Sequence, residues 1–385
     1  MFTLIKDGTI YTPKLIGKKD ILLVGSTIAH IADTINLPED FGGQIISADG
    51  KNVAPGFVDL HVHLAGGGGE TPKARTPEIQ LSSIINAGVT TVIGCLGTDN
   101  VTRTPENLLA KAVQLDLEGI STYIYTGSYQ VPLTTITGSA RKDIALIPKI
   151  IGVGELAISD HRSSQPTYEE LCRIAAEARV GGMIGGKAGI VHLHVGNGKA
   201  GLDTIIRIAQ DTEIPIDQFL PTHVNRNERL FTQAIEFAKL GGNIDITAES
   251  SESTSRKPVS EAISLALESG VGLEQMTISS DSNGSMPTFN EQGRLVGMAV
   301  GDIRNLYKQW IKLVHAGFSL ENALTFITSN PAKRTGIFAT KGSLEIGKDA
   351  DLLIFDENLS LDSVIAKGRL MAQHGEVLVK GTFES

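Results

Sequence analysis

From residue 55 onward the chain alternates short apolar segments with longer amphipathic stretches, and this alternation restricts the folds open to it. Short apolar runs bounded by Gly or Pro are typical of buried strands, and one-sided apolar periodicity is typical of helices packed on a core. Repeated strand–helix units favour a parallel sheet covered by helices. The strand candidates are Phe57–Leu64, Val89–Leu96, Ser121–Thr126, Ile150–Ile158, Gly189–Val195, Phe219–Val224, Asn243–Ala248 and Met276–Ser280.

Eight such units predict an α/β fold, a TIM-like (β/α)8 barrel over residues 55–340. A doubly wound open sheet is the alternative, but no G-x-G-x-x-G motif follows a strand candidate. Two further helices, Asp302–His315 and Leu320–Ser329, are expected after the last strand, the second stopped by Pro331. The chain ends, residues 1–54 and 341–385, consist of short strands and turns, and we expect them to form one small β-sandwich domain.

Charge and cysteine usage exclude several classes of function. A formal net charge of −9 argues against nucleic-acid or anionic-membrane partners. The two cysteines, Cys95 and Cys172, lie in apolar or helical patterns and make neither a disulfide framework nor a zinc–cysteine cluster. The first residues lack the apolar stretch of a signal peptide, and no run is long enough to cross a membrane. We therefore expect a soluble, cytoplasmic protein.

Residues suited to metal binding recur at the strand ends. In a barrel the functional groups lie at the C-terminal ends of the strands. His61 and His63 are two residues apart, so on a strand they point to the same face. A lone H-x-H is equally compatible with a metal site and with one buried core histidine beside one loop histidine, but the other strand ends continue the pattern. They carry Glu155, His194, His223 and Asp281.

This ligand set is large enough for two divalent metal ions. Imidazole and carboxylate groups suit Zn2+ first, with manganese, nickel or iron as alternatives. His192 and His194 form a second H-x-H, and the residue pattern leaves either as the ligand, although His194 lies nearer the strand's C-terminal end.

Several motifs resemble those of the amidohydrolase superfamily. They are D-x-H-x-H at 59–63, single histidines on the fifth and sixth strands, the aspartate after the eighth, and Gly-Lys-Asp-Ala-Asp-Leu at 347–352. More narrowly, the chain resembles the isoaspartyl (β-aspartyl) dipeptidases over nearly its whole length. The stretches that carry this resemblance are 66–70, 97–99, 126–129, 158–162, 220–226, 279–285 and 379–384.

The resemblance implies metal-dependent hydrolysis of β-aspartyl dipeptides by a hydroxide that bridges two metal ions. It implies that His61 and His63 hold the first metal and that His194 and His223 hold the second. Asp281 would ligate the first metal and act as general acid/base. The resemblance also implies a homo-oligomer, an octamer, that salvages small dipeptides.

The chain departs from the family pattern on the fourth strand. The family has a carboxylated lysine there as a metal bridge, and the corresponding residue here is Glu155. A glutamate is already an anion with two ligand oxygens, although it is shorter than a carboxylated lysine. We predict that Glu155 bridges both metals without any need for carbon dioxide.

Other residues on the same rim suit a zwitterionic substrate. Arg162 and Arg226 each follow a strand end, and the planar guanidinium group suits carboxylates. The glycine run 66–69 lacks the Lys-Ser/Thr of a phosphate-binding loop, and we expect it to place Glu70. The resemblance assigns the substrate ammonium to Glu70 and its carboxylates to Arg162, Arg226 and Ser285. It also implies that Tyr129 contacts the oxyanion and that Thr98 helps to orient the aspartyl end of the substrate.

Two other functions are compatible with the same fold. One is a different hydrolase of the superfamily, such as an N-acyl amino acid deacetylase or a dihydroorotase-like cyclic amidase. Glu70, Tyr129 and the two arginines argue against it. The other is a non-catalytic oligomeric scaffold. Such relatives lose metal ligands, whereas this chain lacks only the lysine.

Overall fold

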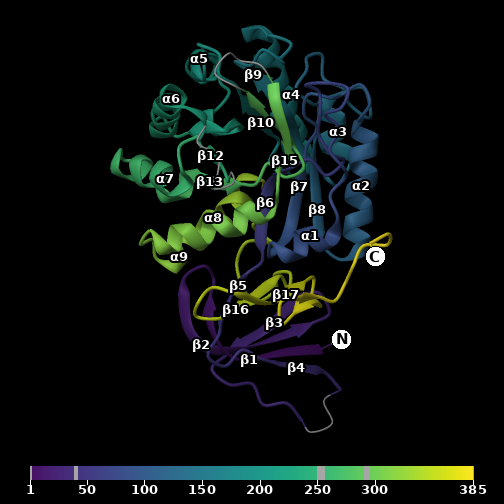
Figure 1. Cartoon of the computed structure of the whole chain (residues 1–385), viewed down its shortest axis with the longest axis vertical. Coiled ribbons are helices and arrows are strands. Elements are labelled where there is room, and N and C mark those ends of the chain that lie inside the picture. The colour runs from purple at the N-terminus through teal and green to yellow at the C-terminus, as the bar shows by residue number, and fades with distance from the viewer. Residues whose placement is uncertain (1, 39–41, 249–255, 290–294, 385) are drawn as a thin grey trace.

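The computed structural model describes residues 2–38, 42–248, 256–289 and 295–384. Figure 1 shows a strand–helix region above a region made only of strands. Within the lower region, the C-terminal strands lie between the strand–helix region and the N-terminal strands. The prediction of a mixed α/β fold with strands at both chain ends is therefore confirmed.

All eight predicted strands are present, and they are parallel. Six form one sheet in the order β11-β10-β9-β8-β7-β6, and the other two form a parallel pair, β12-β13. Their bounds are β6 (Phe57–Val62), β7 (Val89–Gly94), β8 (Ser121–Thr126), β9 (Ile150–Ile158), β10 (Ile190–Val195), β11 (Phe219–Thr222), β12 (Ile244–Thr247) and β13 (Met276–Ser279).

Contacts link the pair to both edges of the six-stranded sheet. Thr222 Oγ1 on β11 donates to Asp245 Oδ2 on β12 at 2.6 Å. A parallel bridge between Val62 and Ser282 links β6 to the segment after β13. Within the described residues the backbone hydrogen bonds thus divide these eight strands between two sheets, and a continuous eight-stranded ring stays a prediction.

Helices follow most of these strands because each buried strand needs apolar cover on its outer side. Their bounds are α1 (Leu81–Asn86), α2 (Pro105–Glu118), α3 (Ala140–Leu146), α4 (Tyr168–Gly185), α5 (Asp203–Asp211), α6 (Glu228–Lys239) and α7 (Val259–Glu268). Capping fixes where several begin. Thr104 accepts a hydrogen bond from Asn107 N ahead of Pro105, and Thr167 with Glu170 forms a capping box.

The helices after β13 differ from the prediction beyond Thr325, where the predicted helix Leu320–Ser329 ends and a third helix follows. They are α8 (Arg304–His315), α9 (Leu320–Thr325) and α10 (Ser329–Arg334). Pro331 does not stop a helix, as predicted, but lies in the first turn of α10. A proline is tolerated there because backbone N–H groups of the first turn have no intrahelical partner.

The chain ends share one nine-stranded sheet. Its strands are β1 (Phe2–Tyr11), β2 (Leu15–Val24), β3 (Thr27–Ala32), β4 (Gln44–Ser47), β5 (Asn52–Pro55), β16 (Leu352–Phe355), β17 (Leu361–Ala366), β18 (Arg369–Gln373) and β19 (Glu376–Val377). β5 joins the two ends, since it pairs parallel with β1 and antiparallel with β16. We expected a sandwich, and hydrogen bonds instead connect all nine strands, around a core that includes Ile21, Leu352 and Ile365.

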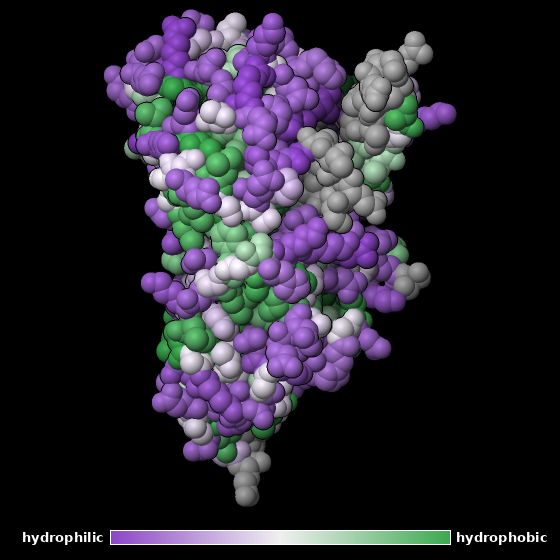
Figure 2. All heavy atoms as spheres, turned by 60° about the vertical axis from the view of Figure 1, so that its left-hand side comes forward, coloured by the Kyte–Doolittle hydropathy of each residue, from purple (hydrophilic) through white to green (hydrophobic). Residues whose placement is uncertain are grey.

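The remaining elements are short. They are a hairpin of β14 (Ser285–Phe289) and β15 (Leu295–Val300), and the 3₁₀ turns η1 (Ile216–Gln218), η2 (Val224–Arg226) and η3 (Leu273–Gln275). Polar residues cover most of the face in Figure 2, with smaller apolar areas between them. Over the described residues, none of the helices combines the length and the apolar character that crossing a bilayer requires.

Candidate metal centre and substrate site

The six predicted ligands meet at the C-terminal ends of the strands, and all are buried. His61 lies on β6 and His63 directly after it, while Glu155 and His194 lie on β9 and β10. His223 follows β11 and Asp281 follows β13. Their ligand atoms fall into overlapping groups in which all members lie within 4.8 Å of one another.

Glu155 lies between the two histidine pairs, and each of its carboxylate oxygens faces one pair. Oε1 is 2.8 Å from His194 Nδ1 and 3.1 Å from His223 Nε2. Oε2 is 3.2 Å from His61 Nε2 and 3.6 Å from His63 Nε2. Asp281 Oδ1 lies 3.4 Å from His61 Nε2 and 3.2 Å from His63 Nε2, so it belongs to the first pair.

The donor atoms fit divalent cations. His61 Nε2 and Glu155 Oε2 are buried, yet within the described residues neither makes a hydrogen bond. Buried polar atoms nearly always have partners, so two such atoms facing each other mark a place for a ligand. Imidazole nitrogens with carboxylate oxygens are the donors that zinc takes in proteins.

Second partners orient three of the imidazoles. His192 Nδ1 lies 3.2 Å from the Leu220 carbonyl, which only accepts, so this nitrogen carries the hydrogen. Burial and the neighbouring His61 lower the pKa of His192 to about 3, so the ring is neutral and its Nε2 accepts from His61 Nδ1 at 2.9 Å. His61 therefore donates from Nδ1, and its Nε2, which faces Glu155, is the nitrogen left to bind a metal.

The second pair is oriented in the same way. His194 Nε2 donates to Asp160 Oδ2 at 2.9 Å, and its Nδ1 faces Glu155 Oε1 at 2.8 Å. His223 Nδ1 lies 2.7 Å from Thr247 Oγ1, and its Nε2 faces Glu155. Such outer contacts fix ring orientation and tautomer around protein-bound metals.

The surrounding charges keep the carboxylates ionised. Burial raises the pKa of Glu155, but the charge of His61 and hydrogen bonds from His194 and His223 outweigh it and hold that pKa well below its usual value. Burial also raises the pKa of Asp281, but His223, His61 and His63 outweigh burial and hold that pKa below its usual value. Both groups therefore carry negative charge toward a bound cation.

Some of the predicted substrate residues contact this cluster or one another. Glu70 Oε1 accepts from Arg162 Nη1 at 3.0 Å, and Glu70 Oε2 accepts from Ser285 Oγ at 2.7 Å. The Arg162 guanidinium also bonds to Asp160 and lies 5.4 Å from the centre of the Tyr129 ring. Tyr129 OH is 2.6 Å from His194 Nδ1, and burial raises its pKa well above the usual value, so the phenol keeps its proton.

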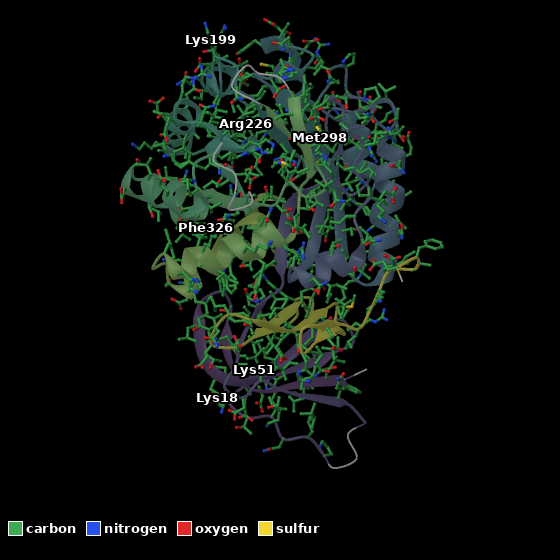
Figure 3. The ribbon with its side chains drawn as sticks, viewed as in Figure 1. Lys18, Lys51, Lys199, Arg226, Met298 and Phe326 are labelled. Carbon is green, nitrogen blue, oxygen red and sulfur yellow. The ribbon has the colours of Figure 1, made fainter. Side chains whose placement is uncertain are left out.

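Arg226 and Thr98 occupy less connected positions. Arg226 lies in η2, just after His223, and is labelled in Figure 3 in the upper half of the molecule, at about the level of Met298 on β15. Its Nε is buried and has no hydrogen-bond partner among the described residues. Burial and the nearby Arg256 lower the pKa of Arg226 to about 10. Thr98 packs against Gly69, where a Cβ would lie only 2.7 Å from the threonine Cβ.

Three contributors were not predicted from the sequence as part of the site. They are Cys95, Asp160 and Thr247. Cys95 directly follows the second strand and Asp160 lies two residues after the fourth, so position at a strand end was the available signal for both. Thr247 closes the seventh strand, but a threonine at a strand end is too common to single out.

Comparisons with known proteins identify the family of this chain. The amidohydrolase family matches residues 52–371. The structure is similar to that of a β-aspartyl dipeptidase from the thermophilic keratin-degrading Fervidobacterium islandicum AW-1 in complex with β-Asp-Leu. That protein is 46% identical, with 98% of each chain covered and a TM-score of 0.91.

More distant relatives include other hydrolases. A dihydroorotase from Lactobacillus johnsonii is 27% identical over 92% of this chain and 89% of its own length. A D-hydantoinase structure with 18% identity and a TM-score of 0.71, covering 100% of this chain and 98% of its own, shares the fold. The resemblance to β-aspartyl dipeptidases predicted from the motifs is therefore confirmed, and the chain belongs to the amidohydrolase family.

Proposed function

We propose that this protein hydrolyses β-aspartyl (isoaspartyl) dipeptides in a reaction that depends on two divalent metal ions. The observation that carries the proposal is the position of Glu155, with one oxygen toward each histidine pair. The pairing of Glu70 with Arg162 and Ser285 on the same rim supports a zwitterionic substrate. The similar β-aspartyl dipeptidase was solved with β-Asp-Leu, a dipeptide of this class.

The ligand assignment follows the two histidine pairs. His61, His63 and Asp281 would hold one ion, His194 and His223 would hold the other, and Glu155 would contact both. When bound, the two ions supply a water of lowered pKa and polarise the substrate carbonyl. Zn2+ is the proposed metal, because imidazole and carboxylate donors suit it.

Glu70 and the arginines would bind and orient the dipeptide. The Glu70 carboxylate exchanges its contact with Arg162 for the substrate α-ammonium, which frees the guanidinium for a substrate carboxylate. Arg226 and Ser285 supply further donors to carboxylates, and Thr98 orients the aspartyl end. Charge-assisted bonds of this kind are the stronger ones in proteins and select the zwitterion.

Two residues would act on the reacting atoms. Tyr129 keeps its phenolic proton, so it can donate a hydrogen bond to the oxyanion that forms at the scissile carbonyl. Asp281 is ionised, so it can accept the proton of the attacking water and pass it to the leaving amino group. This assignment makes Asp281 the general acid/base.

The same proposal extends to the organisation of the protein. Residues 55–340 would form a closed (β/α)8 catalytic barrel, and residues 1–54 with 341–385 a small β domain. The protein would act in the cytoplasm as a homo-oligomer, an octamer by its resemblance to the isoaspartyl dipeptidases.

A substrate panel tests the proposal directly. Purified protein should hydrolyse β-Asp-Leu much faster than α-Asp-Leu, dihydroorotate or an N-acetyl amino acid. Treatment with a chelator should abolish the activity, and added Zn2+ should restore it. Preference for dihydroorotate would favour the cyclic-amidase alternative, to which the 27% identical relative points. Protein that purifies without stoichiometric metal and hydrolyses nothing would favour the scaffold.

A further inference from the structure

One side chain beside the first histidine pair has no place in the function proposed above. Cys95 directly follows β7 and is fully buried. Its Sγ lies 3.9 Å from His63 Nδ1 and 3.8 Å from the Val62 carbonyl oxygen. Together with His61, His63 and Glu155 it forms a group whose ligand atoms all lie within 4.8 Å of one another.

Packing alone does not account for this environment. Cys95 does touch a small apolar cluster that includes Leu60 and Tyr125, and a buried thiol can serve as a small apolar side chain. However, His61 Nε2 and Glu155 Oε2, in the same group, are buried atoms without a hydrogen-bond partner among the described residues. Together with the Cys95 sulfur, these two atoms provide the three kinds of donor that bind zinc in proteins, namely sulfur, imidazole nitrogen and carboxylate oxygen.

We propose that Cys95 is a protein ligand of the metal ion held by His61, His63 and Glu155. The inference rests on the proposed function for the presence of that ion. A thiolate adds a soft, negatively charged donor to a set of nitrogen and oxygen ligands. The metal site formed by His61, His63 and Glu155 would therefore select Zn2+ or Co2+ and discriminate against Mg2+ and Mn2+, which prefer oxygen ligands.

The test uses Co2+ as a spectroscopic substitute for zinc. The whole chain is stripped with a chelator, loaded with Co2+ alone and examined by ultraviolet–visible absorption. Sulfur ligation predicts a ligand-to-metal charge-transfer band in the near ultraviolet that no histidine or carboxylate produces. The band should persist in Cys172→Ser, whose cysteine lies on α4, and disappear in Cys95→Ser while the cobalt d–d bands remain.

A second variant separates ligation from packing. Cys95→Val keeps an apolar side chain of similar size, so a purely packing role predicts unchanged zinc affinity. Ligation predicts that zinc affinity, measured by competition with a chromophoric chelator, falls at least about tenfold in both Cys95→Val and Cys95→Ser. Circular dichroism and Tm of the zinc-free proteins show whether any loss of zinc affinity comes from a change in folding.

The outcomes distinguish this inference from the proposed function. Wild-type protein that binds two Co2+ ions without the charge-transfer band overturns ligation by Cys95 and leaves the dipeptidase proposal standing. A cobalt protein that shows the band but fails to hydrolyse β-Asp-Leu overturns the dipeptidase proposal and leaves the ligand assignment. Wild-type protein that binds no Co2+ overturns both.

Discussion

His192 Nε2 lies 2.9 Å from His61 Nδ1, and the opposite nitrogen of His192 lies 3.2 Å from the carbonyl of Leu220. A backbone carbonyl on β11 therefore determines which nitrogen of a β6 histidine is left to bind a metal. The usual outer partner of a metal-binding histidine is a carboxylate, a carbonyl or a water. Here a second histidine transmits the effect of the carbonyl.

Replacing His192 should weaken metal binding without removing a ligand. In His192→Phe the ring remains but His61 Nδ1 loses its acceptor, so the His61 ring is free to change tautomer. Loss of an outer partner typically costs about 10–100-fold in metal affinity or activity. Metal content per chain and kcat measure the effect. The exposed His30 on β3 provides the control, His30→Phe, and wild-type values in His192→Phe would contradict the prediction.

Glu155 should make assembly of the metal site independent of bicarbonate. Its carboxylate is ionised at neutral pH without modification, whereas a lysine becomes a ligand only after it is carboxylated. Metal-free protein given Zn2+ should regain the same activity with or without bicarbonate. Glu155→Gln should bind less metal, because an amide brings no negative charge. A bicarbonate requirement in the unmutated protein would rule out this role for Glu155.

Glu70 should matter for the substrate rather than for the metal. Glu70→Gln removes a charge-assisted contact to the substrate ammonium, which should cost about 1.5–3 kcal/mol in kcat/KM for β-Asp-Leu. Metal content should stay at the wild-type level. Glu357→Gln, at an exposed turn, is the matched control. If kcat/KM changes by less than about twofold, another group binds the ammonium.

Lys341 should stabilise the contact between the nine-stranded sheet and the strand–helix region. Its side chain is 1% exposed and lies 2.7 Å from Asp349, 2.6 Å from Asp351 and 2.5 Å from Ser121 Oγ on β8. Lys341→Met leaves the 7% exposed Asp351 without its cation, and breaking a buried pair typically costs about 3–5 kcal/mol. Denaturant unfolding of this variant and of the exposed control Lys142→Met measures the loss.

The effect of Lys341 should depend on pH. Burial lowers the pKa of Lys341, but Asp351 and Asp349 outweigh burial and raise it above its ordinary value. A group whose pKa is raised by folding contributes its full stabilisation below its unfolded pKa, about 10.4 for lysine. The difference in unfolding free energy between wild type and Lys341→Met should therefore be constant near neutral pH and shrink as the pH rises through the folded pKa. A difference that grows with pH would refute this assignment.

The strands and the ligands on them were predictable because the signal is local. Each of the eight strands is a short apolar run between turn residues, and β6, with His61 one residue before its end, shows why the end of such a run locates a ligand. Pro331 was misread for a reason that is also local. The sequence marks a helix boundary there, and a proline fits the first turn of a new helix as well as the end of an old one.

What the sequence could not provide are relationships between distant segments. Asp160 reaches His194 across 34 residues, and the hydroxyl of Thr247 reaches His223 across 24. Neither contact leaves a periodic pattern. Likewise, strand propensity predicted β character at both chain ends, but the choice between a sandwich and one connected sheet depends on which edges pair, as β5 does with β16.

The pairing of β5 with β16 has a consequence for how the protein is made. β5 leads directly through Gly56 into β6, which bears His61, yet its antiparallel neighbour lies some three hundred residues later, with Leu353 opposite Ala54. During synthesis the N-terminal segments fold first, and pairings between distant segments form slowly. Until Leu352–Phe355 leaves the ribosome, one edge of β5 has open backbone donors and acceptors, which is the kind of edge on which another chain can add.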